Sequence, residues 1–199
     1  MNHAFPERQP VLSPSLLISA YGKGFFPMAD ENGMVQWHCP DPRAVFPLEN
    51  VRPNTRLQRF LRSSGFALRT NTAFRAVMQY CATVHGESWI SPVMLDAYNA
   101  LHHRGNAHSV ETWLGNQLVG GIYGVSIGGA FFGESMFSLK TNASKAAFHH
   151  LVNHLRQHGF ELFDTQFVNR HTASLGAVEI PRQAFLEALA KATLAPVSF

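Results

Sequence analysis

The spacing of apolar residues alternates along the chain between the period of a helix and that of a strand. Apolar residues at intervals of three and four predict helices, which we expect over residues 12–21, 72–83, 92–104, 144–158 and 182–193. Short apolar or alternating runs bounded by turn residues predict strands, which we expect over residues 66–70, 108–113, 118–125, 130–132 and 160–168.

Glycine, proline and asparagine mark the points where these elements end. Ser13 and Pro14 are residue types that favour the first turn of a helix, and Gly22 is expected to end that helix. Asn32-Gly33 is a strong signal for a hairpin turn between two short apolar runs. The strands of the later meander are joined at Gly115-Asn116 and Gly128-Gly129.

The order of these elements predicts the fold class. A strand, two helices, an antiparallel meander, a helix, a strand and a closing helix form the order of an α+β domain of the N-acetyltransferase-like (GNAT) type. The proline-rich stretch before them indicates a small separate unit. We therefore predict a small N-terminal domain over residues 1–45 and a GNAT-like domain over residues 46–199.

The composition permits a core of ordinary size, because 46% of the 199 residues are hydrophobic. No apolar stretch approaches the ~18 residues that a membrane span needs, and the N-terminus lacks the apolar region of a secretory signal. Cys39 and Cys81 belong to no CxxC pattern, so neither a disulfide framework nor a zinc site is predicted. These features favour a cytoplasmic protein.

The formal net charge of +3 is small, but the arginines gather in one segment. If residues 55–62 form a helix, one stripe contains Arg52, Arg56, Arg59 and Arg62. A solvated helix face is one interpretation of such a stripe. A surface that follows the phosphates of a nucleic-acid backbone is the other, and it fits the rest of the chain better. Such contacts do not read bases, and their affinity falls steeply with salt.

Two polar residues interrupt the apolar run of residues 160–168. Asp164 and Gln166 are two positions apart, so a regular strand would aim both side chains from the same face. For Asp164 alone, an ion pair with a nearby arginine is the alternative to a catalytic role. Asn169 is expected beyond the end of the strand, where it either binds a substrate carbonyl or braces the loop with His171 and Thr172.

Several blocks of the sequence resemble blocks of one enzyme family and stand in the same order. The family is the leucyl/phenylalanyl-tRNA–protein transferases, and the specificity of the resemblance comes from this shared order. The blocks are LSPSLLISAYGKGFFP (12–27), WHCPDPRAVF (37–46), ESWI (87–90), AYNALHHRGNAHSVETW (97–113), VGGIYGVSIGGAFFGESMFS (119–138), NASKAAF (142–148) and FELFDTQFVNRHTASLGAVEIPR (160–182).

The resemblance implies an aminoacyltransferase with the same GNAT-like fold and no cofactor or metal. Its donor would be leucyl-tRNA or phenylalanyl-tRNA, and a pocket for large apolar side chains would also accept methionine. Its acceptor would be the N-terminal α-amine of proteins that begin with Arg or Lys. The added residue would mark these proteins for degradation in the cytoplasm.

The resemblance also implies roles for the polar residues. In the family, the residues that match Asp164 and Gln166 polarise the attacking amine. We expect Gln166 to orient the amine and Asp164 to stabilise its developing positive charge, with Asn169 beside them. Glu134 would belong to the acceptor site, where a carboxylate attracts the cationic side chain or the amine of the acceptor.

The donor would be held by apolar and aromatic residues. The apolar positions around the family's side-chain pocket correspond to Ile122, Phe131 and Met136, although each residue alone is typical of an ordinary core. Trp89 and Tyr98 are expected to stack on the terminal adenosine of the tRNA. The chain departs from the family at Met28, which stands where a second stacking tryptophan is often found.

Two other functions fit part of the sequence. A coenzyme-A-dependent acetyltransferase would share the fold, but it needs a glycine-rich start to a helix that binds the pyrophosphate. Residues 138–142 lack those glycines. A non-catalytic RNA-binding module would explain the arginines, but it would leave Asp164, Gln166 and Glu134 without a purpose.

A metal site is also suggested by one short pattern. His150, His154 and His158 stand at four-residue spacing on a predicted helix, which places their side chains over one another. No carboxylate or cysteine completes a ligand set, and the HExxH pattern is absent. We therefore predict a polar helix face here and no metal.

Overall fold

The computed structural model describes residues 12–84 and 89–199. Residues 1–11 of the expected N-terminal domain, and Glu87 and Ser88 of the ESWI block, lie outside this part of the chain. A mixed α+β architecture is present, as predicted. Of the helices in the described part, none is both long and apolar enough to cross a membrane.

A seven-stranded sheet forms the centre of the described chain, with the strand order β4-β5-β6-β7-β8-β3-β9. Neighbouring strands are antiparallel except β7 and β8, which are parallel. The strands are β3 (Arg43–Val45), β4 (Phe66–Thr70), β5 (Ala107–Leu114), β6 (Gln117–Ile127), β7 (Ala130–Ser138), β8 (Leu162–Gln166) and β9 (Val178–Ile180).

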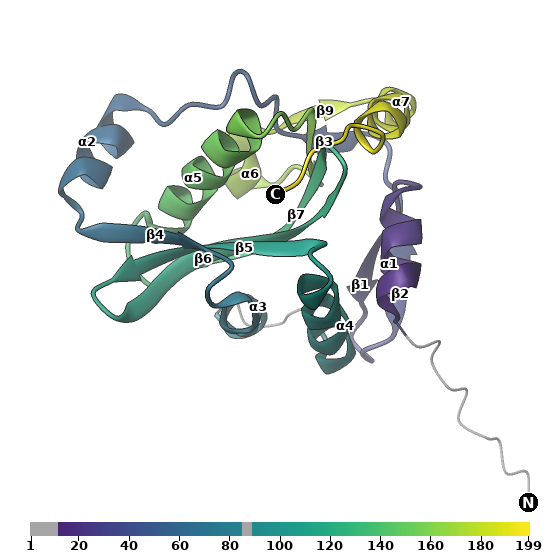
Figure 1. Ribbon diagram of the computed structural model, residues 1–199, viewed down its shortest axis with the longest axis horizontal. Helices are drawn as coiled ribbons and strands as arrows, with labels where there is room; N and C mark the ends of the chain where they lie inside the picture. The colour runs from purple at the N-terminus through teal and green to yellow at the C-terminus, as the bar shows by residue number, and fades with distance from the viewer. Residues whose placement is uncertain (1–11, 85–88) are drawn as a thin grey trace, which may run out of the picture.

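Helices cover both faces of this sheet, as Figure 1 shows. On one face lie α3 (Phe74–Thr83) and α4 (Pro92–His103), and on the other lies α5 (Ala143–Gln157). The predicted apolar stripe of α3 is buried, with Phe74, Val77, Met78 and Cys81 turned to the core. At the start of α5 the helix approaches β6 closely, since a Cβ added to Gly120 would lie 2.6 Å from the Cβ of Ala143.

The N-terminal segment packs against the same core as the sheet. Its helix α1 (Pro14–Tyr21) begins at the predicted N-cap, where the Ser13 hydroxyl accepts a hydrogen bond from the N–H of Leu16. The predicted hairpin at Asn32-Gly33 is also confirmed, between β1 (Phe26–Ala29) and β2 (Val35–His38). Buried residues of this segment share one cluster with α3, α4 and the sheet, among them Leu17, Tyr21 and Phe26.

The predicted order of elements after residue 45 is confirmed, but several boundaries differ. Strand β7 runs to Ser138 rather than residue 132, and β8 is shorter than the expected 160–168. Three short elements escaped prediction because they hold too few residues to show a period: β3, β9 and α6 (Arg170–Ser174). The division into two domains at residue 45 stays a prediction. Strand β3 lies in the expected N-terminal domain, yet it pairs with β8 and β9, which lie in the expected GNAT-like domain.

Two further helices lie outside these layers. The described chain contains α2 (Thr55–Ser63), close to the expected range, and the closing helix α7 (Arg182–Ala192). In Figure 1, α2 lies at the left-hand edge of the molecule, above β4 and on the same side of the sheet as α5. Leu57 is its only buried residue, so most of its surface faces solvent.

Candidate active site

The parallel strands β7 and β8 diverge and leave a cavity between them. Their pairing ends at Phe132 and Asp164. Beyond that pair lies a cavity of about 410 Å³, lined by residues 133–138 of β7, by Phe163 and Thr165 of β8, and by residues around α6. Ile122 of β6, Ser144 of α5, Phe46 and Trp89 complete its wall. We call this cavity the large lobe.

A second cavity of about 220 Å³ adjoins the first and is the small lobe. Aromatic and sulfur-containing side chains form part of its wall, namely Phe26, Met28 and Phe167. The residues that line both lobes are Trp89, Glu134, Thr165, Asn169 and Thr172. The two lobes therefore form one site, with Glu134 at their junction.

A β-bulge places Glu134 at this junction. Tyr123 of β6 lies opposite Ser135, and the next residue, Gly124, lies opposite Gly133, so Glu134 is the extra residue of β7. Such a bulge re-aims a side chain relative to the regular strand. Gly124 is required at this point, because an added Cβ would lie 2.2 Å from the carbonyl oxygen of Phe132.

Hydrogen bonds hold the carboxyl group of Glu134 from two sides. The Tyr98 hydroxyl donates to Oε2 at 3.2 Å, and the Gln166 amide donates to Oε1 at 3.1 Å. The hydroxyls of Tyr21 and Tyr98 are also hydrogen-bonded to each other. Burial raises the pKa of both tyrosines well above the usual value, and the nearby Glu134 adds to this rise. Both hydroxyls therefore stay protonated.

Burial also raises the pKa of Glu134 to about 8, with a further contribution from the negative charge of Asp164. The hydrogen bonds from Tyr21 and Tyr98 and the charge of Arg43 oppose this rise but do not cancel it. Glu134 is thus largely neutral at pH 7. A cation bound beside it would favour the ionised form.

Asp164 forms a buried ion pair with Arg43, and both side chains are fully buried. The pair is bidentate: Nε donates to Oδ1 at 2.8 Å and Nη2 donates to Oδ2 at 2.7 Å. Asp164 does not line either lobe of the site. The expectation that its charge stabilises the attacking amine stays a prediction, and the arginine pairing considered as the alternative is present.

The same-face prediction for Asp164 and Gln166 fails because β8 is irregular between them. Ala44 of β3 lies opposite Gln166, whereas the adjacent Val45 lies opposite Asp164, so Thr165 is an extra residue. Gln166 has a φ of 60°, and its backbone N–H donates to Oδ1 of Asp164 at 3.1 Å. The side chain of Gln166 consequently turns to the small lobe and to Glu134.

Asn169 follows the strand, as expected, and serves as the N-cap of α6. Its Oδ1 accepts hydrogen bonds from the N–H groups of His171 at 2.8 Å and Thr172 at 2.9 Å. The bracing role is thus present. Because Asn169 also lines both lobes, its amide group remains a candidate for contact with a substrate.

The expected apolar lining is present in part. Ile122 and Met136 line the large lobe, together with Phe46, Phe137 and Phe163. Phe131 does not line either lobe, because its ring packs into the core against Phe163 at a centroid distance of 5.5 Å. Phe131 belongs to the same buried cluster as Ile122 and Phe163, but only the latter two reach the cavity wall.

The two expected stacking residues are placed differently. Trp89 lines both lobes, where a planar base could reach it. Tyr98 is completely buried within the core under α4 and cannot stack on an adenine, so this expectation requires correction. Its hydroxyl instead donates the hydrogen bond that holds Glu134 from behind and is bonded to Tyr21. Met28 lines the small lobe.

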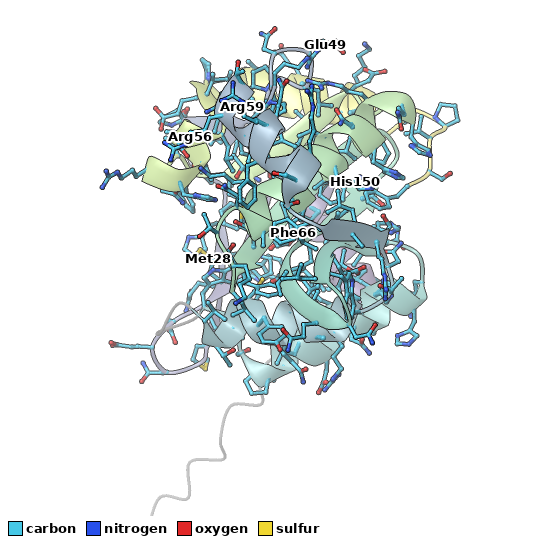
Figure 2. The ribbon with its side chains drawn as sticks, turned by 90° about the vertical axis from the view of Figure 1, so that its left-hand side faces the viewer. Met28, Glu49, Arg56, Arg59, Phe66 and His150 are labelled. Atoms are coloured by element: carbon cyan, nitrogen blue, oxygen red, sulfur yellow. The ribbon has the colours of Figure 1, made fainter. Side chains whose placement is uncertain are left out.

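The four arginines do not form one helical stripe. Arg56, Arg59 and Arg62 belong to α2, whereas Arg52 precedes its N-cap, Asn54, and donates to the carbonyl oxygen of Val51 at 3.0 Å. All four side chains are exposed. Figure 2 shows Arg56, Arg59 and Met28 toward the same edge of the molecule, and His150 toward the other edge.

His150, His154 and His158 do not simply form a polar surface, because the ring of His154 packs against other rings. The rings of His154 and His158 stack at 4.0 Å, and His154 also packs against Phe199. Burial lowers the pKa of His154 to about 4, followed by the effects of His158 and His150. In the described part of the chain, no three side chains of metal-binding type come together.

Sequence reasoning missed the residues that support the site from behind. Arg43 could not be identified as the partner of Asp164, because its strand β3 has only three residues and shows no period. Tyr21 and Thr165 gave no signal, because their positions depend on the packing of α1 and on a bulge.

Comparisons with known proteins identify one enzyme family. The family model for leucyl/phenylalanyl-tRNA protein transferase matches residues 45–190, and the model for the N-terminal domain of the same enzyme matches residues 11–41. Proteins of that name from Shewanella denitrificans and Gloeobacter violaceus are each 49% identical to this chain. The matches cover 90% of this chain and 78% of the first relative, and 94% of this chain and 97% of the second.

Solved structures with a general likeness include a GCN5-related N-acetyltransferase from Anabaena variabilis. It is 13% identical, with a TM-score of 0.47, and the match covers 80% of this chain and 40% of that protein. The C-terminal domain of a putative lysylphosphatidylglycerol synthetase from Agrobacterium fabrum is 14% identical, with a TM-score of 0.45. That match covers 82% of this chain and 56% of that protein.

The first prediction concerns the buried ion pair. Arg43→Met leaves the Asp164 carboxylate buried without a counter-charge, and we expect the free energy of unfolding to fall by about 3–5 kcal/mol. The control is Arg75→Met, which breaks the exposed pair with Asp96 and should cost less than ~1 kcal/mol. Urea unfolding measures both. Equal losses in the two variants would contradict the prediction. The double variant Arg43→Met/Asp164→Leu removes the unpaired charge as well, so it should be more stable than Arg43→Met alone.

The second prediction concerns Glu134, whose pKa lies near 8 in the folded protein and near 4.5 when unfolded. Between these values the folded state holds a proton that the unfolded state has released, so the free energy of unfolding falls as pH rises. The slope is at most about 1.4 kcal/mol per pH unit. Glu134→Gln should remove this slope between pH 5 and 8, roughly the span between the two pKa values. Parallel stability curves for the two proteins would show that Glu134 titrates normally.

Proposed function

The chain belongs to the leucyl/phenylalanyl-tRNA protein transferase family, and we propose that it transfers leucine or phenylalanine from tRNA to the N-terminal α-amine of a protein. The observation that carries this proposal is the two-lobed cavity with Glu134 and Gln166 at its junction. One lobe suits an apolar side chain, and the other has aromatic walls. An ester of adenosine with a large apolar amino acid has these same two parts.

The large lobe supports a role in holding the donor's side chain. Its apolar wall includes Ile122, Met136, Phe137 and Phe163. Burial of a leucine or phenylalanine side chain there is favourable by roughly 1.5–3 kcal/mol. Because a hydrophobic pocket distinguishes one methylene by only ~1–3 kcal/mol, methionine fits the same lobe as an additional donor.

The small lobe supports a role in holding the terminal adenosine. Trp89 is shared by both lobes, and Phe167 offers a second ring that is 44% exposed. Stacking on an aromatic side chain contributes ~1–3 kcal/mol per base. Met28 lines the same lobe and packs against a ring less specifically than a tryptophan would.

The chemistry needs a well-placed amine more than a strong base. The amine nitrogen forms a bond to the ester carbonyl carbon, the bond from that carbon to the ribose oxygen breaks, and one proton passes from nitrogen to the ribose oxygen. The side-chain N–H of Gln166 donates to Glu134, which leaves the amide oxygen of Gln166 to accept an N–H of the attacking amine. Gln166 and Asn169 would orient the reactants, and such positioning is worth up to ~7–11 kcal/mol.

Asp164 would act as a positioning residue in this scheme. It accepts the backbone N–H of Gln166 and is itself fixed by Arg43. This pair holds Gln166 in its left-handed backbone conformation without touching the substrate. The charge of Asp164 also contributes to the raised pKa of Glu134.

Glu134 supports the preference for acceptors that begin with Arg or Lys. A guanidinium or ammonium group bound at the junction would ionise this carboxyl group and pair with it. The added Leu or Phe would then form the new N-terminus, which we propose serves as a signal for protein degradation. Charged tRNA and its protein acceptors meet in the cytoplasm, where we place the reaction.

The exposed arginines support binding of the tRNA backbone. Arg56, Arg59 and Arg62 project from α2, with Arg52 beside them, and none forms an ion pair within the described chain. Contacts with phosphates release counterions, so the affinity for tRNA should fall with salt. A role in coenzyme A binding is less well supported, because the start of α5 has no glycine-rich turn.

The function is tested by offering radiolabelled leucyl-tRNA together with a peptide that begins with Arg. We expect label on the peptide, and none when the peptide's N-terminus is acetylated. Labelled acetyl-CoA with the same peptide is the second reaction. Transfer from acetyl-CoA alone would overturn the proposal, and tRNA binding without any transfer would support the RNA-binding module instead.

Gln166→Ala removes the group proposed to orient the amine. We expect kcat for transfer to fall by about 10²-fold or more, since a misplaced reactant loses this much. The Kd for tRNA should stay within twofold, because Gln166 is far less exposed than the arginines of α2. Single-turnover transfer and filter binding measure the two quantities. Loss of both to the same degree would show a folding role.

A further inference from the structure

A third cavity lies on the other side of the start of α5. Its volume is about 390 Å³, and its walls come from α2 with its N-cap Asn54 and Arg52, from the first two turns of α5 and the two residues before them, and from the end of α6. No residue of the proposed catalytic group lines it. We call it the basic cavity.

The charged groups around the basic cavity are all positive. Arg52, Arg56 and Lys145 line it, and none of the described residues in its wall is acidic. In the described part of the chain, Arg56 and Lys145 have no ion-pair partner. Three cations around one hollow repel each other, so an anion there would remove an unfavourable interaction.

The start of α5 adds hydrogen-bond donors to the same wall. Asn142 precedes the helix in a left-handed conformation with a φ of 64°, and its side chain does not cap the helix. The first turn contains no acidic residue. Among the described residues, the backbone N–H of Lys145 has no hydrogen-bond partner. The positive end of a helix of 15 residues therefore faces this hollow without a neutralising side chain.

His149 is the second and independent sign of a ligand. Its side chain is only 7% exposed, yet it lines the basic cavity. Within residues 12–84 and 89–199, the ring nitrogens of His149 have no hydrogen-bond partner. The ring nitrogens are not among the fully buried atoms that lack a partner, so they are open to the cavity although the residue as a whole is buried. A hydrogen-bond acceptor held in the cavity would reach them.

The start of α5 also separates this cavity from the proposed active site. Ser138 and Ser144 line the large lobe, whereas Asn142 and Lys145 line the basic cavity. The N–H of Ser144 donates to the Ser138 hydroxyl at 3.1 Å, which fixes this thin wall. If the 3′ end of an oligonucleotide lies in the proposed active site, one of the phosphates before that end would lie at the basic cavity, on the other side of this wall.

We propose that the basic cavity binds a backbone phosphate of the aminoacyl-tRNA, near its 3′ end. Lys145 and Arg56 would pair with the phosphate, while the N–H of Lys145 and the ring of His149 would donate hydrogen bonds to it. The proposal rests on the proposed function for the identity of the nucleic acid. Whereas the arginines of α2 are exposed, the basic cavity would hold one phosphate at a fixed position relative to the active site.

The test compares Lys145→Gln with Lys140→Gln, a matched control in the same segment whose side chain does not line the basic cavity. Filter binding of uncharged tRNA is measured at several salt concentrations. We expect Lys145→Gln to raise the Kd by about tenfold, as loss of one charge-assisted contact does. The slope of log K against log salt should fall by about 0.7–0.9, the value for one phosphate. Equal changes in both variants would overturn the proposal.

A phosphate-free donor separates this proposal from the proposed function. With leucyl-adenosine as the donor, the defect of Lys145→Gln in kcat/KM should disappear, since this ester carries no phosphate. A defect that persists with leucyl-adenosine would mean that Lys145 acts on the active site, and would overturn the inference. If the unaltered protein transferred leucine from neither donor, the proposed function would be wrong. The comparison of tRNA binding by Lys145→Gln and Lys140→Gln would still test the basic cavity.

His149 provides a further readout. His149→Leu removes the hydrogen-bond donor and should weaken tRNA binding, whereas His149→Gln keeps a donor and should restore most of it. The ring of His149, followed by NMR, should shift when tRNA is added and stay unchanged with inorganic phosphate at the same concentration. A shift with inorganic phosphate alone would show that the cavity holds a free anion, and would overturn the assignment to RNA.

Discussion

The site depends on the buried ion pair between Arg43 and Asp164, which joins separate parts of the chain. Besides Asp164 of β8, the guanidinium of Arg43 donates to the carbonyl oxygen of Gly24 at 2.8 Å. The rings of Phe26 and Phe185 lie over the same guanidinium at 4.7 Å and 4.4 Å. One cation thus holds the N-terminal segment, the closing helix and the strand that bears Gln166. A buried pair of this kind adds little net stability but is costly to break, so it favours one arrangement of these elements over others.

The cavity follows from irregularities in the sheet rather than from its regular part. Strands β7 and β8 separate after Phe132 and Asp164, and an extra residue occurs in each strand just beyond that pair. These bulges turn Glu134 and Gln166 toward each other across the opening. A regular pair of strands would have closed the space with side chains. The polar groups of the site are therefore a product of the same irregular geometry that makes room for a substrate.

Sequence patterns predicted the long helices well, because Leu17 and Val77 obey the helical period, and the meander glycines indicated the turns between strands. The end of β7 was missed. The order of the blocks also predicted the family, and it directed attention to Glu134 and Gln166 before their contact was visible. The failures have a common physical cause. The faces of Asp164, Phe131 and Tyr98 depend on bulges and on packing between distant segments, which a period of two or 3.6 residues does not encode. A short strand such as β3 gives no periodic signal, so the partner of Asp164 could not be identified.

The division of labour between the strands has a consequence for redesign. The apolar wall of the large lobe is contributed by Ile122, Met136 and their neighbours, whereas the polar junction depends on Glu134 and Gln166. The size of the large lobe and the polar chemistry of the junction are thus set by different side chains. If the proposed donor arrangement holds, trimming Ile122 or Met136 would admit bulkier or synthetic amino acids. The machinery that joins them to a protein terminus would remain intact, and the fold would become a template for labelling reagents.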